Sequence, residues 1–402
     1  ISHPDIIEFL NIRIPSGGDS NRKCFNINNA VNITDNFMDS VSSDSDWDLI
    51  DPHDGSVRDT VRARELWERV LETRFRTGEP YIHFIDESNR KLPEPLKKKG
   101  LEIKGSNLCA EITLPTNSDR TAVCCLSSLN LEKFDEWKDS TIVEDLIEML
   151  DNVLTKFIDH APQPALFKAT SSALTERSLG LGAMGFHSYL QSKSIPWESA
   201  MAVGQNKMMF AYIKQHALKA TKDLCKTKSE YMYGFGTGRR NSHLLAIAPN
   251  ANSGMIIGTS PSIEPLKSNS FIHKTRVGSH LIRNKHLQEV MEEHRLRLGK
   301  DLDWLEAEWR NIGHHQGSVQ QLDYLTDWEK DVFKTAFELD QHWVVQHASD
   351  RQVYICQSQS VNLFFPAGSD KSYVNSVHIS AFNKKLKTLY YLRTSSTQVA
   401  EN

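Results

Sequence analysis

The chain contains several long stretches in which apolar residues recur at helical spacing. From Thr141 to His160, apolar side chains stand three or four positions apart, which predicts an amphipathic helix with one buried face. Thr141 and Glu144 have the spacing of a capping box, so we expect this helix to begin there. The same periodicity predicts helices over residues 60–78, 201–227, 280–298, 328–348 and 371–384.

Shorter apolar runs between these helices have the character of strands. Residues 81–85 are rich in β-branched and aromatic side chains, whereas residues 92–105 are rich in Pro, Lys and Gly, which predicts an exposed loop. Helices and strands alternate, which favours an α/β fold, and no Pro/Ser-rich linker divides the chain, so we expect one continuous domain over residues 1–402. Further extended segments are predicted over residues 108–114, 122–131, 243–248, 353–361 and 386–393.

Composition narrows the class of protein. With 39% hydrophobic and 24% charged residues in a chain of 402, the sequence has the composition of a soluble globular protein. The formal net charge is -4 and no basic region stands out, so nucleic-acid binding has no electrostatic support. No apolar run approaches the ~18 residues of a membrane span, and no signal peptide is visible. We therefore expect a cytoplasmic protein, located in the host cytoplasm if a phage encodes it.

Metal-binding patterns are absent from the sequence. The six cysteines include no Cys-x-x-Cys pair, so we expect reduced thiols rather than a structural zinc site. His243, His273, His314 and His315 have no metal-ligand spacing either, and we expect no metal bound to this chain.

The stretch from Ser106 to Ile112 carries three chemically useful side chains at alternate positions. In an extended strand Asn107, Cys109 and Glu111 would share one face, which places an amide, a thiol and a carboxyl in a row. The carboxylate can accept a proton, and the thiol can act as a nucleophile or carry a radical. A half-exposed strand with a buried cysteine explains the spacing equally well.

Three other motifs are ambiguous when each is considered alone. Residues 249–254 combine Asn, Ser and Gly, whose backbone N–H groups could bind an anion or form an ordinary turn. Arg177 precedes a Gly-x-Gly-x-x-Gly pattern at residues 180–185, but no βαβ context supports a dinucleotide site, so we expect a close-packed turn and helix start. Tyr390 and Tyr391 would point to opposite faces of a regular strand and could be packing residues.

Taken together, these motifs resemble the class Ia ribonucleotide reductase large subunit. The sequence Asn-Leu-Cys-Ala-Glu is similar to the family's finger-loop motif, and further similar segments follow in the family's order. The resemblance implies most of a ten-stranded α/β barrel with a central finger loop, belonging to the C-terminal catalytic part of that subunit. The further similar segments are residues 122–131, 177–185, 248–254 with 263–265, 357–362 and 387–391.

The resemblance also implies a role for each residue of the finger loop. Cys109, as a thiyl radical, would remove the 3′ hydrogen of a ribonucleoside diphosphate. Glu111 would take the proton of the 3′ hydroxyl, and Asn107 would orient the sugar hydroxyls. Leu108 and Ala110 complete the predicted substrate-binding loop.

Two further pairs of residues acquire roles from the resemblance. Tyr390 and Tyr391 correspond to a stacked pair that relays a radical to the active-site cysteine. Cys124 aligns with a redox-active cysteine of the family, whereas its neighbour Cys125 does not. The cysteine that forms a disulfide with Cys124 would lie outside this chain, because Cys24 is not in the corresponding motif.

A phosphate-binding loop is implied at Pro249, Asn250, Ala251, Asn252 and Ser253. The family often has Ser-Glu-Thr-Ser where this chain has Asn250 to Ser253. Ala251 lacks a polar side chain, so only its backbone can contact the substrate.

The resemblance implies partners rather than a bound cofactor. We expect a radical from the metal centre of a small subunit, and an external dithiol, thioredoxin or glutaredoxin, as the reductant. The ATP cone, the first part of the barrel and the tail cysteines have no counterpart here, so we expect a separate N-terminal fragment of the large subunit. Two alternatives stay open: a hydrolase with Cys109 as the nucleophile, and a scaffold that only binds subunits.

Overall fold

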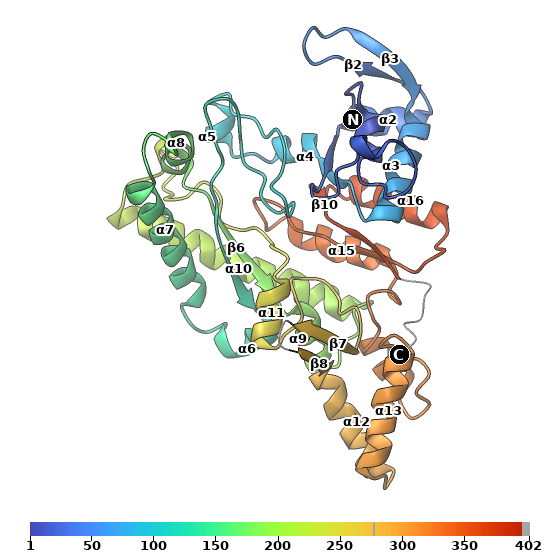
Figure 1. The fold of residues 1–402 in the computed structure, drawn as a ribbon. Coiled ribbons are helices and arrows are strands. Elements are labelled where there is room, and N and C mark those ends of the chain that lie inside the picture. Colours follow the sequence, from blue (N-terminus) through green and yellow to red (C-terminus); the bar gives the residue numbers. More distant parts are fainter. Residues whose placement is uncertain (276–277, 396–402) are drawn as a thin grey trace.

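The computed structural model describes residues 1–275 and 278–395. Helices surround short strands, so the predicted α/β class is confirmed. The N-terminal residues and the last helix, α16 (Lys371–Asn383), lie together at one end of the molecule (Figure 1). An arm of two helices, α12 (Lys285–Arg297) and α13 (Leu302–His314), extends from the other end.

Strands from distant parts of the chain form the central wall. β4 (Tyr81–Phe84) pairs in parallel with β1 (Ala30–Ile33) and antiparallel with β10 (Thr388–Leu389). β5 (Cys125–Asn130) pairs in parallel with β6 (Leu179–Met184). The wall therefore brings the N-terminal, central and C-terminal motifs of the sequence together. The number of ten strands in a complete barrel stays a prediction.

Residues 243–248 and 353–361 continue this wall through isolated bridges rather than as the regular strands we predicted. The N–H groups of Leu244 and Leu245 donate to Sγ of Cys356 instead of to a strand carbonyl. A side chain thus takes the hydrogen bonds that a regular ladder would use.

The long predicted helices are confirmed. α7 (Ile142–His160) and α10 (Ala200–Thr227) pack on β5 and β6 to form one apolar core. α3 (Ala63–Thr77) packs with α16 in a second core around β4. Gly78 ends α3 with a positive φ of 84°, a conformation that glycine adopts without strain.

The predicted helix 280–298 is too long at its start. Residues of this stretch form β8 (Gly278–Arg283), which pairs antiparallel with β7 (Ser270–Thr275), and α12 begins only afterwards. Helix α13 was not predicted. The remaining helices and strands are α1 (Ile6–Asn11), α2 (Asp35–Ser43), α4 (Ile85–Arg90), α6 (Phe134–Trp137), α8 (Phe167–Glu176), α9 (Phe186–Ser192), α11 (Ala251–Ile257), β2 (Asp46–Ile50), β3 (Val57–Arg62), β9 (Leu363–Phe365) and β11 (Leu392–Thr394).

The predicted helix 328–348 is divided in two. α14 (Asp327–Val332) and α15 (Gln341–Gln352) are separate because each has its own cap. Thr326 forms a capping box with the third residue of α14, and the carboxylate of Asp340 accepts a backbone hydrogen bond from the first turn of α15.

Two smaller predictions are wrong. The Thr141 hydroxyl donates to the carboxylate of Asp145 at 2.8 Å and forms no cap hydrogen bond at the start of α7. The stretch 92–105 is not simply an exposed loop. It contains a short helix, α5 (Glu94–Lys97), and buries Leu96 completely because this side chain packs in a small apolar cluster.

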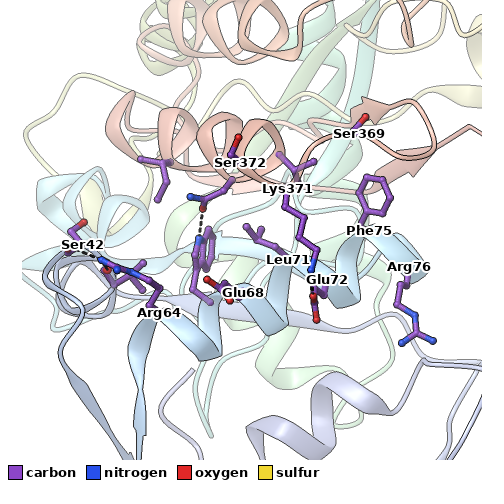
Figure 2. A pocket seen from close by; sticks show the side chains of 15 residues that line it. Ser42, Arg64, Glu68, Leu71, Glu72, Phe75, Arg76, Ser369, Lys371 and Ser372 are labelled. Carbon is purple, nitrogen blue, oxygen red and sulfur yellow. Dashed lines mark hydrogen bonds and ion pairs between the residues drawn. The ribbon is translucent and has the colours of Figure 1, made fainter.

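A groove of about 1040 Å³ lies between α3 and α16 (Figure 2). Trp67 and Leu71 line it, and the indole of Trp67 donates to Asn375 at 2.8 Å. An ion pair of 2.6 Å joins Lys371 and Glu72 at its rim. None of the predicted site residues lines this groove.

Candidate active site

The finger-loop motif is a tight loop and not the extended segment we predicted. The N–H of Asn107 donates to the carbonyl of Ile112 at 3.2 Å, and the N–H of Ile112 donates back to Oδ1 of Asn107 at 3.0 Å. Ala110 has a positive φ of 67°. Because the loop reverses, Leu108 is 61% exposed whereas Ala110 is fully buried.

The neighbouring wall holds the loop by its carbonyl groups. The Ser360 hydroxyl donates to the carbonyl of Cys109, and the Thr388 hydroxyl donates to the carbonyl of Ala110 at 2.9 Å. Ser358 lies 2.6 Å from the Thr388 hydroxyl and completes this row of hydroxyl groups. The Gln-Ser-Gln-Ser motif thus has a positioning role that sequence reasoning did not assign to single residues.

Glu111 is buried beside the loop cysteine. Its side chain is 2% exposed, and Oε2 accepts a hydrogen bond from the Ser360 hydroxyl at 3.4 Å. Burial raises the pKa of Glu111 above its ordinary value, and hydrogen bonds from Asn107 and Ser360 only partly oppose this. A carboxyl group of this kind is suited to exchange a proton near neutral pH.

Cys109 is half-buried and carries a thiol rather than a thiolate. Burial raises its pKa, Glu111 adds to the shift, and the hydrogen bond from Tyr390 acts in the opposite direction. The Tyr390 hydroxyl lies 3.7 Å from Sγ. A protonated thiol next to a phenol is suited to hydrogen-atom exchange between the two groups.

Tyr390 and Tyr391 lie on the same side of the chain. The predicted strand 386–393 is interrupted between β10 and β11, and the two tyrosines occupy the break. Their ring centroids are 4.4 Å apart, with an interplanar angle of 59°. The expectation that they point to opposite faces is therefore wrong, because it assumed a regular strand.

A third tyrosine, Tyr81, completes an aromatic cluster that the sequence did not reveal. Its ring centroid lies 4.6 Å from that of Tyr390 and 4.9 Å from that of Tyr391. The antiparallel pairing of Ile82 with Leu389 brings Tyr81 and Tyr390 together. Only knowledge of this pairing could have identified it, since Tyr81 looks like an ordinary strand residue.

Tyr391 is held from two further directions. The guanidinium of Arg393 lies 3.8 Å from its ring centroid, at cation–π distance. Its backbone N–H donates to Oδ1 of Asn362 at 3.1 Å, and the amide of Asn362 donates in turn to the carboxylate of Glu264. Burial raises the pKa of Glu264. Two motif residues therefore position the backbone of Tyr391.

Cys124 and Cys125 belong to different sides of the wall. Cys124 packs with Ile112 and Leu114, which follow the finger loop, whereas Cys125 packs against the core on the other side. The amide of Gln357 donates to Sγ of Cys124 at 3.2 Å. Burial raises the pKa of the Cys124 thiol. The choice of Cys124 as the redox residue stays a prediction that this geometry favours.

The glycines after Arg177 provide space for this side of the wall. A Cβ at Gly180 would lie 2.4 Å from Leu126 and 3.0 Å from Sγ of Cys124. A Cβ at Gly182 would lie 2.5 Å from the carbonyl oxygen of Ala246. Close packing is therefore as predicted, but the predicted turn is wrong because both glycines lie in β6.

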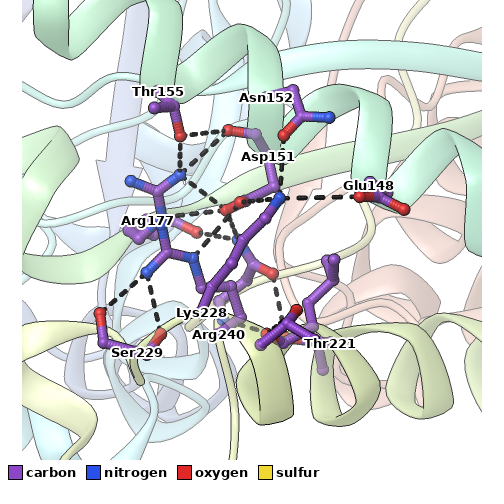
Figure 3. A network of polar contacts seen from close by, with 12 residues as sticks. Glu148, Asp151, Asn152, Thr155, Arg177, Thr221, Lys228, Ser229 and Arg240 are labelled. Atoms are coloured by element: carbon purple, nitrogen blue, oxygen red, sulfur yellow. Dashed lines mark hydrogen bonds and ion pairs between the residues drawn. The ribbon is translucent and has the colours of Figure 1, made fainter.

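Arg177 itself anchors a buried polar network (Figure 3). It donates to the carboxylate of Asp151 at 2.7 and 2.9 Å and to Thr155 at 2.6 Å. Asn241 and Arg240 also contact this carboxylate, at 2.9 and 3.3 Å. Burial raises the pKa of Asp151, but the cations outweigh it and hold the pKa below its ordinary value. Arg177 thus joins α7 to β6 and contacts no candidate substrate group.

The candidate phosphate loop is formed by residues 249–253 at the start of α11. Asn250 has a positive φ of 49°, and its amide donates to Ser128 of β5 at 2.8 Å. Its side chain is therefore engaged within the wall, and Ala251 to Ser253 are exposed. Their N–H groups belong to the first helical turn, where intrahelical acceptors are lacking. β5 links this loop to the region of Cys124.

The structure shows little sign of other binding chemistry. Within residues 1–275 and 278–395, no group of three His, Cys, Asp or Glu side chains could hold a metal ion. In that same part of the chain, no helix is long and apolar enough to span a membrane.

An α/β wall around a looped thiol, with a tyrosine pair behind it, defines a class of radical enzyme folds, and comparison with known proteins identifies the family. The family model described as "Ribonucleotide reductase, barrel domain" matches residues 1–236 and 234–392. The chain therefore belongs to the ribonucleotide reductase barrel-domain family, and the predicted fold is confirmed.

Individual relatives support this assignment over nearly the whole chain. A protein of Frog virus 3 (isolate Goorha) is 53% identical over 396 residues, covering 98% of this chain and 69% of the relative. The ribonucleoside-diphosphate reductase large subunit of Invertebrate iridescent virus 3 is 45% identical over 450 residues, covering 98% and 70%. The solved Actinobacillus ureae class Id ribonucleotide reductase alpha subunit is similar at a TM-score of 0.85 and 36% identity, covering 98% and 69%.

Proposed function

We propose that this chain is the catalytic barrel of a ribonucleoside-diphosphate reductase large subunit, with residues 1–402 as one catalytic domain. The observation that carries the proposal is the contact of 3.7 Å between the Tyr390 hydroxyl and Sγ of Cys109, with Tyr391 packed directly behind. This arrangement suits stepwise transfer of a hydrogen atom to and from the thiol.

The first part of the proposed reaction is radical transfer. A radical arriving from a small subunit oxidises Tyr391 and then Tyr390 in turn. Tyr390 takes the hydrogen atom of the Cys109 thiol, which leaves a thiyl radical beside the substrate. The raised pKa values of Tyr390 and Cys109, caused mainly by burial, keep both groups protonated before transfer.

The second part is reduction at the ribose. The Cys109 thiyl radical removes the 3′ hydrogen, Glu111 takes the proton of the 3′ hydroxyl, and Asn107 orients the sugar. The 2′ hydroxyl leaves as water. Cys124 and a second cysteine supply two electrons and two protons and become a disulfide, after which the hydrogen atom returns from Cys109 to C3′.

Substrate phosphates are proposed to lie at residues 249–253. The exposed N–H groups of the first turn of α11 favour an anion there. Asn252 and Ser253 add polar side chains, whereas Ala251 contributes only its backbone. The side chain of Asn250 holds the loop on β5 instead of reaching the substrate.

The partners follow from this chemistry. We propose a radical-bearing small subunit, and thioredoxin or glutaredoxin as the dithiol that reduces the disulfide again. The second redox cysteine and the effector-binding region would be supplied by polypeptide outside these residues, as a separate N-terminal fragment in a split large subunit. Affinity purification from the native source tests this arrangement, and co-purification of such a fragment is the expected result.

The finer class and location are also proposals. We retain class Ia, with deoxyribonucleotide synthesis in the cytoplasm. Metal analysis of the small subunit that supports turnover tests the class, since the radical centre belongs to that subunit.

The reaction itself is tested with a substrate deuterated at C3′. A kinetic isotope effect on kcat/KM is expected in the complete enzyme, because Cys109 breaks that bond. Reduction without any isotope effect and with Cys109→Ser still active would contradict the proposal. A hydrolase with a Cys109 thiolate is disfavoured, since the pKa of this thiol is raised. Nothing in the structure favours a purely scaffolding role.

A further inference from the structure

A second cavity, of about 680 Å³, lies where α4, α15 and α16 end. Its lining contains none of the residues proposed above for catalysis or substrate binding. The charged side chains that line it are six cations and one carboxylate: Arg90, Lys91, Lys214, Lys384, Lys385, Lys387 and Glu87. The whole chain carries a net charge of -4, so this excess of positive charge is local.

Most of these cations have no counter-charge. The single carboxylate, Glu87, is paired with Arg90, which also binds Asp35. Within the described residues, no ion pair is formed by Lys91 or Lys214. The same holds for the remaining lysines of the cavity.

Two of these lysines are tied to neutral groups. Lys384 donates to the side-chain carbonyl of Gln346 at 2.6 Å. Lys387 is 3% exposed, and its ammonium donates to the carbonyls of Cys356 and Gln357 at 2.6 and 2.8 Å. Burial lowers the pKa of Lys387 to about 8, which shows how strongly an anion nearby would be favoured.

Helix dipoles do not explain the whole cluster. Lys91 and Lys384 follow the last turns of α4 and α16, where cations stabilise the helix terminus. Lys214, however, lies in the middle of α10, and Lys387 lies beyond any helix. Both nevertheless line the same cavity.

The wall of the cavity also holds a cysteine tuned toward its anionic form. Sγ of Cys356 accepts the N–H groups of Leu244 and Leu245 at 3.0 and 3.2 Å. Burial raises the pKa of Cys356, but Lys214 and these two donors outweigh it, so the pKa lies below its ordinary value. The thiol therefore provides a chemical reporter inside the cavity.

We propose that this cavity binds a small molecule with a di- or triphosphate group. Clustered ammonium groups recognise phosphate as point charges. The volume lies within the roughly 300–1,000 Å³ typical of small-molecule sites. This site is separate from the proposed phosphate loop and does not depend on the proposed reaction.

Calorimetric titration with inorganic tripolyphosphate at about 0.15 M ionic strength tests the proposal. The double variant Lys91→Gln/Lys214→Gln is expected to bind at least about tenfold more weakly, since each lost charge-assisted hydrogen bond corresponds to roughly that factor. Lys226→Gln is the matched control, because Lys226 lies on α10 with Lys214 but outside the cavity, paired with Asp223. It should bind like the unaltered protein.

A second readout needs no variant. Tripolyphosphate should slow alkylation of Cys356, followed residue by residue by mass spectrometry, and leave alkylation of Cys225 unchanged. Unchanged affinity in the folded double variant, or unprotected Cys356 at saturating tripolyphosphate, overturns the proposal. Tighter binding of a hexaglutamate peptide than of tripolyphosphate overturns it as well, because the cavity would then suit an acidic protein segment.

Discussion

The hydroxyl of Tyr390 donates a hydrogen bond to Sγ of Cys109 across 3.7 Å, joining residues that are 281 positions apart in the sequence. The contact exists because β10 pairs with β4 and because the finger loop is bonded to Thr388, the first residue of β10. One strand thus positions both the phenol and the thiol. Most of the predictions below follow from this contact and from the groups around it.

Cys109→Ser should abolish ribonucleotide reduction in the complete enzyme while leaving the fold intact. A serine hydroxyl holds its hydrogen too strongly for exchange with the Tyr390 radical. The exchange of sulfur for oxygen at a half-buried position should change the free energy of unfolding by less than about 1 kcal/mol. Turnover assays and urea unfolding measure the two effects separately. Retained turnover would remove Cys109 from the mechanism.

Tyr390→Phe and Tyr391→Phe should each stop turnover without weakening nucleotide binding. Phenylalanine keeps the ring and its packing but has no oxidisable O–H group. Equilibrium binding of a nucleoside diphosphate and the rate of reduction are the measurements. Near-normal rates in both variants would mean that the two rings serve only as packing.

Tyr81→Phe is the matched control for that pair. Its ring touches both tyrosines, but its hydroxyl has no hydrogen-bond partner in the described part of the chain. Turnover should therefore be retained in Tyr81→Phe. Tyr81→Ala should reduce turnover, because loss of the ring lets Tyr390 and Tyr391 move apart. Loss of activity in Tyr81→Phe would instead place Tyr81 on the transfer path.

Glu111→Gln should keep substrate affinity and lower kcat by about 10²–10⁴-fold, the usual contribution of a general base. In the unaltered enzyme the base must be deprotonated, so activity should fall as the pH drops through the pKa of Glu111. Burial raises this pKa, which moves the acid limb above the ordinary glutamate value of about 4.3. The pH profile of kcat/KM checks this, and an acid limb that persists in the Gln variant would assign the base elsewhere.

Cys124→Ser should block multiple turnovers, whereas Cys125→Ser should be mild. Cys124 packs beside the residues that follow the finger loop, and Cys125 packs in the core on the other side of the wall. Without the Cys124 thiol no disulfide can form to supply two electrons. Counting product per enzyme with excess dithiol measures the effect. The reverse ranking of the two variants would show that Cys125 is the redox residue.

The chemistry of the finger loop could be predicted from the sequence, but its geometry could not. Alternation suggested that Asn107, Cys109 and Glu111 share a strand face, whereas Asn107 in fact closes a loop with Ile112. A side chain that replaces a ladder hydrogen bond leaves no periodic signal. The same reason explains why residues 243–248 were predicted as a strand, since Cys356 takes the backbone N–H groups there.

Long-range pairing was the second obstacle. The helices α7 and α10 were predicted well because their apolar faces recur along the sequence. Tyr81 was missed because its importance comes only from a strand more than 300 positions away. Arg177 was known as a motif residue, but its partner Asp151 lies on the buried face of α7, where a lone carboxylate has no sequence pattern.

Asp151→Ala should destabilise the fold without changing the chemistry. Arg177 is 3% exposed, and removal of its carboxylate partner would leave a buried guanidinium uncompensated, at a cost of about 3–5 kcal/mol. Asp135→Ala is the control, because Asp135 pairs with Lys138 at a partly exposed site, where an ion pair contributes up to about 1 kcal/mol. Urea unfolding near neutral pH compares the two variants.

The pH dependence of the same measurement gives a second check on Asp151. The folded pKa of this carboxyl lies below its ordinary value of about 3.9. Its contribution to stability is therefore complete above the unfolded pKa, and it is lost as the pH falls through the lower, folded pKa. The difference in unfolding free energy between the unaltered protein and Asp151→Asn should accordingly shrink on acidification. A constant difference at all pH values would mean that the Arg177 contact contributes no charge-dependent stability. At a temperature where the variant stays folded, its KM and kcat should match those of the unaltered enzyme, since Arg177 contacts no candidate substrate group.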